Sequence, residues 1–352
     1  MPARNQSPNS AGRLFYFVAL DIGDEVDLQR ASRMLEQAGK TTAASVDIGL
    51  VRPSIQFEAQ HELEFEDSPL ERVVVTIYHY GTVSVRYEFA CAVTKPDELR
   101  DRSIKLREMV DQLIAEANRI VEQATALIRK SIRKPKLSVL MEDYVVYSLS
   151  LADEDPNEWI SESEAVVAQA LQLASEELSA ASVTDTLKRR ISHYKRDLAI
   201  VTWDSTLLIN TALDKALALI EFLNAQLLAT RVTKQIVDTE LQRSFALLSA
   251  PFWRASGPKK VALMRAETAY LFADLRHTLG HIREEYLWLL HESVASVLGL
   301  EMAESEISGT LDAIESITGS MYNRATIIRM EWLTIVIILL ITLEIVLGYL
   351  LH

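Results

Sequence analysis

The chain has 352 residues, a formal net charge of −13 at pH 7 and a single cysteine, Cys91. An acidic surface repels phosphate backbones, so nucleic acid is disfavoured as the main partner, although a local basic patch could still bind it. One cysteine excludes an internal disulfide and a CxxC motif. Because 49% of the residues are hydrophobic and only 11 are glycine, the composition predicts a globular protein with long helices.

Residues 1–13 contain no acid, and we expect a disordered N-terminus there. Residues 14–151 mix strand and helix signals, and so predict an α+β domain. The apolar runs at 14–20, 72–90 and 144–150 are typical of strands, the second run being two strands that turn near Gly81. Periodic apolar positions predict helices over 24–38 and 96–129.

The helix over 96–129 carries an apolar seam whose spacings alternate between four and three residues, as in a coiled coil. Packing of this seam on the protein's own sheet is favoured over packing on another subunit. The seam consists of Leu106, Val110, Leu113, Ala117, Ile120, Ala124 and Leu127.

Residues 152–325 begin with an acidic linker at 152–158 and predict a mainly helical domain. One exception is a strand near 198–209, which could join the first sheet. Two long helices over 211–248 and 260–298 are separated by a proline- and glycine-containing break, which predicts an antiparallel helical hairpin.

Residues 332–351 (WLTIVIILLITLEIVLGYLL) contain one charge in 20 residues. A helix of this length spans roughly 30 Å, the thickness of a bilayer core, and Trp332 and Tyr349 suit its two interfaces. Residues 326–352 are therefore predicted to be a tail anchor in the lipid bilayer, with a buried core helix as the alternative. Arg324 and Arg329 precede the span, which places the head in the cytoplasm at a bacterial inner membrane, or in the matrix at a mitochondrial inner membrane.

Glu344 interrupts the predicted span. An ionised carboxylate at that depth costs on the order of 2.5–3.5 kcal/mol on insertion scales. It indicates a helix–helix interface, in an oligomer or with another membrane protein, or else a single tolerated acid.

Three groups of polar residues are candidates for chemistry. Glu221, Asn224, Arg231 and Asp238 form a polar row along an otherwise apolar helix, which favours salt bridges between neighbouring elements over an active site. His277, His281 and Glu284 have helical spacing suited to a metal, but they lack the HExxH pattern, so they are weak candidates. A basic patch could meet anionic lipid or RNA, or could be a solvated helix end; it consists of Arg129, Lys130, Arg133, Lys134 and Lys136.

Three stretches carry a resemblance: 191–210 (ISHYKRDLAIVTWDSTLLIN), 217–231 (LALIEFLNAQLLATR) and 329–351. Together they resemble the YagE-like domain family of unknown function, which includes the required-for-meiotic-nuclear-division proteins of mitochondria, and this chain looks like a bacterial-type member. The pattern's helix supplies Glu221, Asn224, Gln226, Leu227, Leu228 and Arg231, and the end of the chain supplies Glu331, Trp332 and Glu344.

The chain departs from the family pattern at 232–235 (VTKQ), where an aromatic-rich, acid-containing segment is usual, and at Arg196, where an acid is common. The resemblance implies a membrane-anchored homo-oligomer whose mitochondrial relatives support organellar translation. It implies no reaction.

The sequence thus predicts an α+β head, an α-helical hairpin domain and one C-terminal transmembrane helix, acting as a self-associating scaffold or assembly protein. We assign no catalytic residue, cofactor or small-molecule substrate, because no phosphate-binding loop or nucleophile elbow occurs. The alternatives are a metal-dependent hydrolase using His277, His281 and Glu284, or an RNA-associated factor acting through 129–136.

Overall fold

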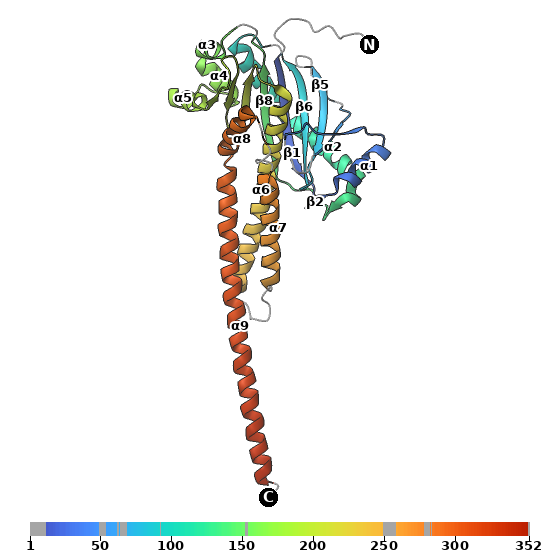
Figure 1. Ribbon diagram of the computed structural model, residues 1–352, viewed down its shortest axis with the longest axis vertical. Coiled ribbons are helices and arrows are strands. Elements are labelled where there is room, and N and C mark those ends of the chain that lie inside the picture. Colours follow the sequence, from blue (N-terminus) through green and yellow to red (C-terminus); the bar gives the residue numbers. More distant parts are fainter. Residues whose placement is uncertain are drawn as a thin grey trace. The chain divides into compact units, whose positions relative to one another are not determined.

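The computed structural model describes residues 12–48, 54–61, 63, 69–91, 93–151, 154–248, 258–277, 282 and 284–350 (Figure 1). The chain divides into two compact units: unit 1 is Met1–Val232 with Ala273–Glu301, and unit 2 is Thr233–Phe272 with Met302–His352. The protein is mixed α/β with a large sheet and a helical C-terminal part, as the sequence predicts. The division into separate domains at 14–151 and 152–325 stays a prediction.

Unit 1 is built on a sheet that has nine strands among the described residues, in the order β3-β4-β5-β6-β1-β8-β11-β10-β9. Every neighbouring pair is antiparallel except β11 with β8, which is parallel. The strands are β1 (Gly12–Asp21), β3 (Thr42–Ala44), β4 (Ile55–Glu58), β5 (Leu70–Ile77), β6 (Thr82–Cys91), β8 (Met141–Leu149), β9 (Arg190–Ile191), β10 (Leu198–Val201) and β11 (Ser205–Ile209). A separate pair joins β2 (Glu25–Val26) to β7 (Ile132–Arg133).

The predicted strands at 14–20, 72–90 and 144–150 are confirmed as β1, β5 with β6, and β8. The expected disorder of 1–13 is wrong for Gly12 and Arg13, because their backbones pair with Cys91 and Ala90 of β6. Residues 1–11 lie outside the described part. The strand expected near 198–209 is two strands, β10 and β11, because Thr202 and Ser205 close a turn between them, and β11 joins the large sheet beside β8.

One face of the sheet packs on α2 (Pro96–Ile128). Alternate residues of β6, such as Val85 and Tyr87, lie in the same hydrophobic core as Leu106 and Leu113 of the predicted seam. The hydroxyl of Tyr87 donates to the Leu113 carbonyl at 2.8 Å. The seam therefore packs on the protein's own sheet, except at Leu127, which is 40% exposed.

The opposite face of the sheet meets the first half of α6 (Leu213–Leu248), which crosses in front of the strands in Figure 1. Arg86 of β6 points to this face and contacts Glu221 of α6. The sheet is thus covered by helices on both sides, which explains why β6 is almost wholly buried.

Two helix predictions need correction. The helix expected over 24–38 is α1 (Leu28–Gln37), because Glu25 and Val26 pair in β2 and the Asp27 side chain caps the helix by accepting from the Arg30 N–H. The helix expected over 260–298 is two helices, α7 (Pro258–His277) and α8 (Glu285–Val297), since Glu284 is extended. The two bury apolar residues in different units, Phe272 in unit 2 and Leu290 in unit 1.

The remaining helices of unit 1 are short. They are α3 (Pro156–Ser161), α4 (Glu164–Leu171), α5 (Ala180–Lys188) and the 3₁₀ turn η1 (Arg129–Ser131). α4 packs on α2 and on α5, and Trp159 of α3 donates its ring N–H to the Thr94 carbonyl at 3.0 Å. Residues 154–158 of the predicted linker include Pro156, which starts α3.

Unit 2 comprises the second half of α6, most of α7, and nearly all of α9 (Leu300–Leu350), a single helix of 51 residues. Ion pairs tie α9 to both partners: Lys234 of α6 bonds Glu306, and Arg265 of α7 lies 2.7 Å from Asp312. Ile307 and Ile314 of α9 are buried. Residues 249–257 between α6 and α7 lie outside the described part, so the hairpin stays a prediction.

Because His291 of α8 is largely buried, we expect the stability of the fold to fall at acidic pH. Burial lowers the pKa of its imidazole from 6.5 to about 4, so the folded state binds fewer protons than the unfolded state between these values. The contribution of the neutral His291 to the free energy of unfolding is complete above pH 6.5. Up to about 3 kcal/mol of that free energy is lost as the pH falls towards 4. Urea midpoints between pH 4 and 7 measure this loss.

His291→Gln should flatten that pH dependence. His193→Gln, at an exposed residue, should leave it as in the unaltered protein. Equal pH profiles for the unaltered protein and His291→Gln would contradict the assignment.

Candidate functional site

The polar row predicted on α6 is divided between two environments. Glu221 and Asn224 face the sheet of unit 1 and are each 1% exposed. Arg231 is half-buried at the end of the unit 1 portion of α6, whereas Asp238 lies in unit 2. Only the first three of the four residues therefore lie in unit 1.

Four charged side chains connect α6 to the sheet. Arg86 Nη1 donates to Glu221 Oε2 at 2.6 Å, and Arg86 Nε donates to Glu88 Oε1 at 2.9 Å. Arg72 of β5 donates to Glu88 from the outer side at 2.9 Å. We call Arg72, Arg86, Glu88 and Glu221 the charge network. Its formal charges sum to zero, as a stable buried network requires.

The electrostatics of the charge network follow from burial. Burial acts to lower the pKa of Arg86, but the charges of Glu221 and Glu88 outweigh it and raise that pKa above its ordinary value. The guanidinium therefore stays charged at every physiological pH. Its role is to compensate buried carboxylates, and it is unsuited to proton transfer.

A second contact fixes the next turns of α6. Arg231 bonds the carboxylate of Glu142 on β8 and lies 5.7 Å from the ring centre of Trp203. Asn224 Nδ2 donates to the Glu142 carbonyl at 3.4 Å. Burial raises the pKa of Glu142, and the charge of Arg231 opposes that rise.

Several buried polar atoms beside these contacts accept no hydrogen bond from the described residues. They are Glu221 Oε1, Asn224 Oδ1, Thr82 Oγ1 and Ser84 Oγ. Such atoms are costly, so the α6–sheet interface carries more polarity than packing alone requires. The arrangement fixes the position and register of α6 on the sheet.

The sequence reasoning found the α6 side of this interface but missed Arg72, Arg86 and Glu88. The sequence does contain a signal for two of these residues. Arg86 and Glu88 stand at alternate positions in VSVRYEF, an otherwise apolar strand, and alternation places them on the same face. Two opposite charges on one face of a buried strand predict a partner across the sheet.

The candidate metal ligands are only partly described. His277 is the last residue of α7, the position of its side chain is not described, and His281 lies outside the described residues. Glu284 bonds Lys215 of α6. Among the side chains that the structure describes, no group of three histidine, cysteine or acidic residues could hold a metal. The hydrolase stays a prediction without support from these contacts.

The basic patch at 129–136 is exposed at all five of its bases. Acidic residues oppose part of its charge: Lys134 lies 2.7 Å from Asp24, and Arg133 lies 3.9 Å from both Asp24 and Glu25. Burial and the nearby Asp24 raise the pKa of Asp21 to about 7, while Lys136 acts in the opposite direction. The patch is therefore a mixed-charge surface.

The second part of α9 is apolar and exposed. Residues Met330–Leu347 have a mean hydropathy of 2.4, and none of this segment is buried. Trp332 is 63% exposed and Glu344 is also exposed, whereas the side chain of Tyr349 is not described. Thr334 and Thr342 donate to carbonyls one turn earlier in the helix. By length and composition, this one described helix could cross a membrane.

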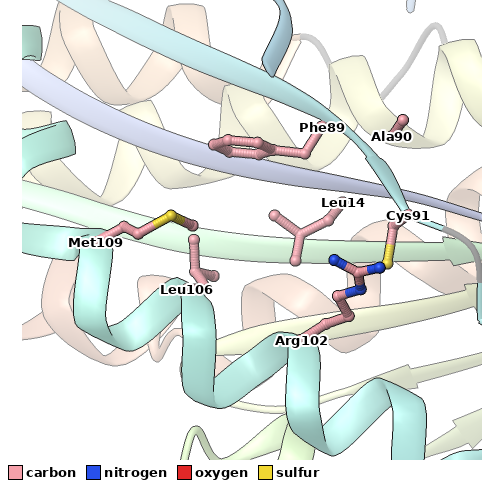
Figure 2. Close-up of a pocket in the computed structure, with 7 residues that line it drawn as sticks. All are labelled: Leu14, Phe89, Ala90, Cys91, Arg102, Leu106 and Met109. Carbon is pink, nitrogen blue, oxygen red and sulfur yellow. The ribbon is translucent and has the colours of Figure 1, made fainter. Parts of the chain in front are cut away.

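A small hollow lies at the end of β6 between the sheet and α2 (Figure 2). Its volume is about 10 Å³, room for about one water molecule. Leu14, Leu106 and Met109 line it together with Cys91 and Arg102. Burial raises the pKa of the Cys91 thiol to about 11, so this thiol is a weak nucleophile at neutral pH.

The fold and these surfaces define a class: a mixed α/β protein with a charge network under α6 and one C-terminal helix able to cross a membrane. Residues 11–215 match the family described as the N-terminal domain of uncharacterized protein MJ0711. The match covers more than half of the 352 residues, so the chain belongs to this family. No curated protein and no solved structure matches the chain.

Proposed function

We propose that the protein is a membrane-anchored scaffold that holds an α/β unit at a membrane surface. One observation carries this proposal: α9 is continuous from residues packed in unit 2, such as Ile307 and Ile314, to an apolar segment with no packing partner in the described chain. Exposed apolar surface of this extent is unfavourable in water and suits a lipid environment.

The α6 interface supports a structural role for unit 1. α6 begins on the sheet at the charge network and continues into unit 2, where Lys234 bonds Glu306 of α9. A helix shared by both units suits a protein whose folded unit must be held by its anchor. The proposal includes the antiparallel α6–α7 hairpin.

Further parts of the proposal rest on the sequence. Arg324 and Arg329 precede the span, which favours the cytoplasmic or matrix side for the head. Glu344 in the span favours self-association through a polar contact. The resemblance to the YagE-like family supports the same anchored, homo-oligomeric role and suggests assistance to translation.

Membrane fractionation with carbonate extraction tests the anchor. The unaltered chain should remain in the membrane pellet. Ile338→Arg combined with Leu339→Arg should move it to the supernatant, since two central charges cost about 5–7 kcal/mol on insertion scales.

The matched control is Met302→Arg combined with Ile327→Arg. These residues are exposed on the same helix but precede the apolar segment. This variant should stay in the pellet. Extraction of the unaltered chain, or retention of the Ile338 and Leu339 variant, would overturn the proposal.

A further inference from the structure

A basic and aromatic loop lies between β9 and β10 in unit 1. Residues 188–196 hold five lysines and arginines, and no acid occurs between Asp185 and Asp197. His193, Tyr194, Lys195 and Arg196 are all exposed, Tyr194 to 70%. In a chain with a net charge of −13 this is a marked local reversal of charge. We call residues 192–197 the HYKR loop.

The backbone of the HYKR loop is fixed from within. Asp197 Oδ1 accepts the N–H groups of His193 at 2.9 Å and Tyr194 at 2.7 Å. Ser192 Oγ donates to the Tyr194 carbonyl at 2.7 Å. Asp197 is 9% exposed, so this acid serves the backbone of the loop and is largely withdrawn from its surface.

Asn210 connects the HYKR loop to the sheet. Its Nδ2 donates to the Arg196 carbonyl at 2.9 Å, and its Oδ1 accepts the Leu151 N–H at 2.9 Å. The backbone of Asn210 has a positive φ of 52°, a conformation that asparagine tolerates better than most residues. The loop is therefore held in one conformation before any partner binds, which lowers the entropy cost of binding.

We propose that the HYKR loop is a binding site for single-stranded nucleic acid. Tyr194 offers an exposed ring for stacking on a base, and the His193 ring meets it edge-on with centres 4.5 Å apart, which holds its orientation. Lys195 and Arg196 follow directly and suit phosphates next to that base. An exposed aromatic ring followed by two cations suits a base and its phosphates, whereas an acidic peptide supplies no base for the ring to stack on.

The net charge does not exclude this site. At about 0.1 M salt the Debye length is about 10 Å, so the distant acids are screened and the local charge decides. Arg190, on the strand before the loop, is paired with Glu164 at 3.3 Å, so the proposed contacts are assigned to the loop itself.

The test is fluorescence anisotropy of the full chain in detergent with a labelled oligouridylate of about 12 nucleotides, a length within the usual site sizes. Tyr194→Ala should weaken binding by roughly tenfold, a typical loss for one stacked base. Lys195→Gln with Arg196→Gln should lower the salt slope by about 1.4, at about 0.7 for each phosphate contact.

The matched control is Arg129→Gln with Lys130→Gln, which removes the same charge at exposed residues elsewhere. Its affinity should stay near that of the unaltered chain. Absence of oligouridylate binding, an equal loss in this control, or binding only to vesicles containing phosphatidylglycerol would each overturn the proposal.

Asp197→Ala separates loop geometry from charge. Electrostatics alone predicts tighter binding when an acid is removed, whereas loss of the fixed loop predicts weaker binding. Weaker binding supports the proposal and tighter binding contradicts it. If this variant does not fold, Tyr194→Ala decides, because Tyr194 is mostly exposed.

Discussion

Replacing Arg86 with methionine should lower the free energy of unfolding by about 3–5 kcal/mol. The change leaves the Glu221 carboxylate, which is 1% exposed, without its cation. Glu88 still keeps Arg72 at 2.9 Å, so the loss falls mainly on the contact between α6 and the sheet. Urea denaturation followed by circular dichroism measures it.

Two further variants make this prediction specific. Arg72→Met removes a cation that is 47% exposed, so its cost should stay below about 1 kcal/mol. Arg86→Met combined with Glu221→Met should recover most of the lost stability, because an apolar pair of similar volume often replaces a buried ion pair without net cost. If the double variant is as unstable as Arg86→Met alone, the pairing does not explain the loss.

Gly81→Ala should destabilise the protein by about 3–6 kcal/mol, combining backbone strain with a steric clash. Gly81 closes the β5–β6 turn with a φ of +86°. A Cβ atom there would lie 1.7 Å from the carbonyl oxygen of Gly23. Gly23 has no side chain that could move aside, so the backbone itself must shift.

Gly39→Ala is the matched control for strain alone. Gly39 has a φ of +81° but no atom within 4 Å of an added Cβ. Its cost should be about 1–2 kcal/mol. Thermal denaturation of both variants gives the free-energy cost of the clash as the difference between their destabilisations. Equal destabilisation would show that a small backbone shift removes the clash between Gly81 and Gly23 at little cost in free energy.

Local patterns in the sequence determined a large part of the fold. The aromatic and β-branched runs predicted β1, β5, β6 and β8, and the apolar periodicity predicted α2 with its seam. Each of these signals depends only on residues within one element, since strand and helix periods place neighbouring side chains on a shared face. Errors occurred where local preference conflicted with pairing, as at Glu25 and Val26 in β2.

The sequence indicated only the α6 side of the candidate site. Glu221, Asn224 and Arg231 stand out as polar residues on an apolar helix, but their spacing gives no partner. Arg86 is 135 positions from Glu221, and contact between them depends on which helix covers which face of the sheet. The fixed conformation of the HYKR loop depends on Asn210, which follows β11 in the chain.

The sequence by itself determined the strands β1, β5, β6 and β8, the helix α2 and the apolar character of the C-terminal helix, because these properties reside in consecutive residues. Tertiary structure alone decided the parallel pairing of β11 with β8. It also decided the separation of α7 from α8 and the pairing of Arg86 with Glu221. These features arise when distant segments bury surface together, and a buried charge selects its partner only after the fold has removed water from around it.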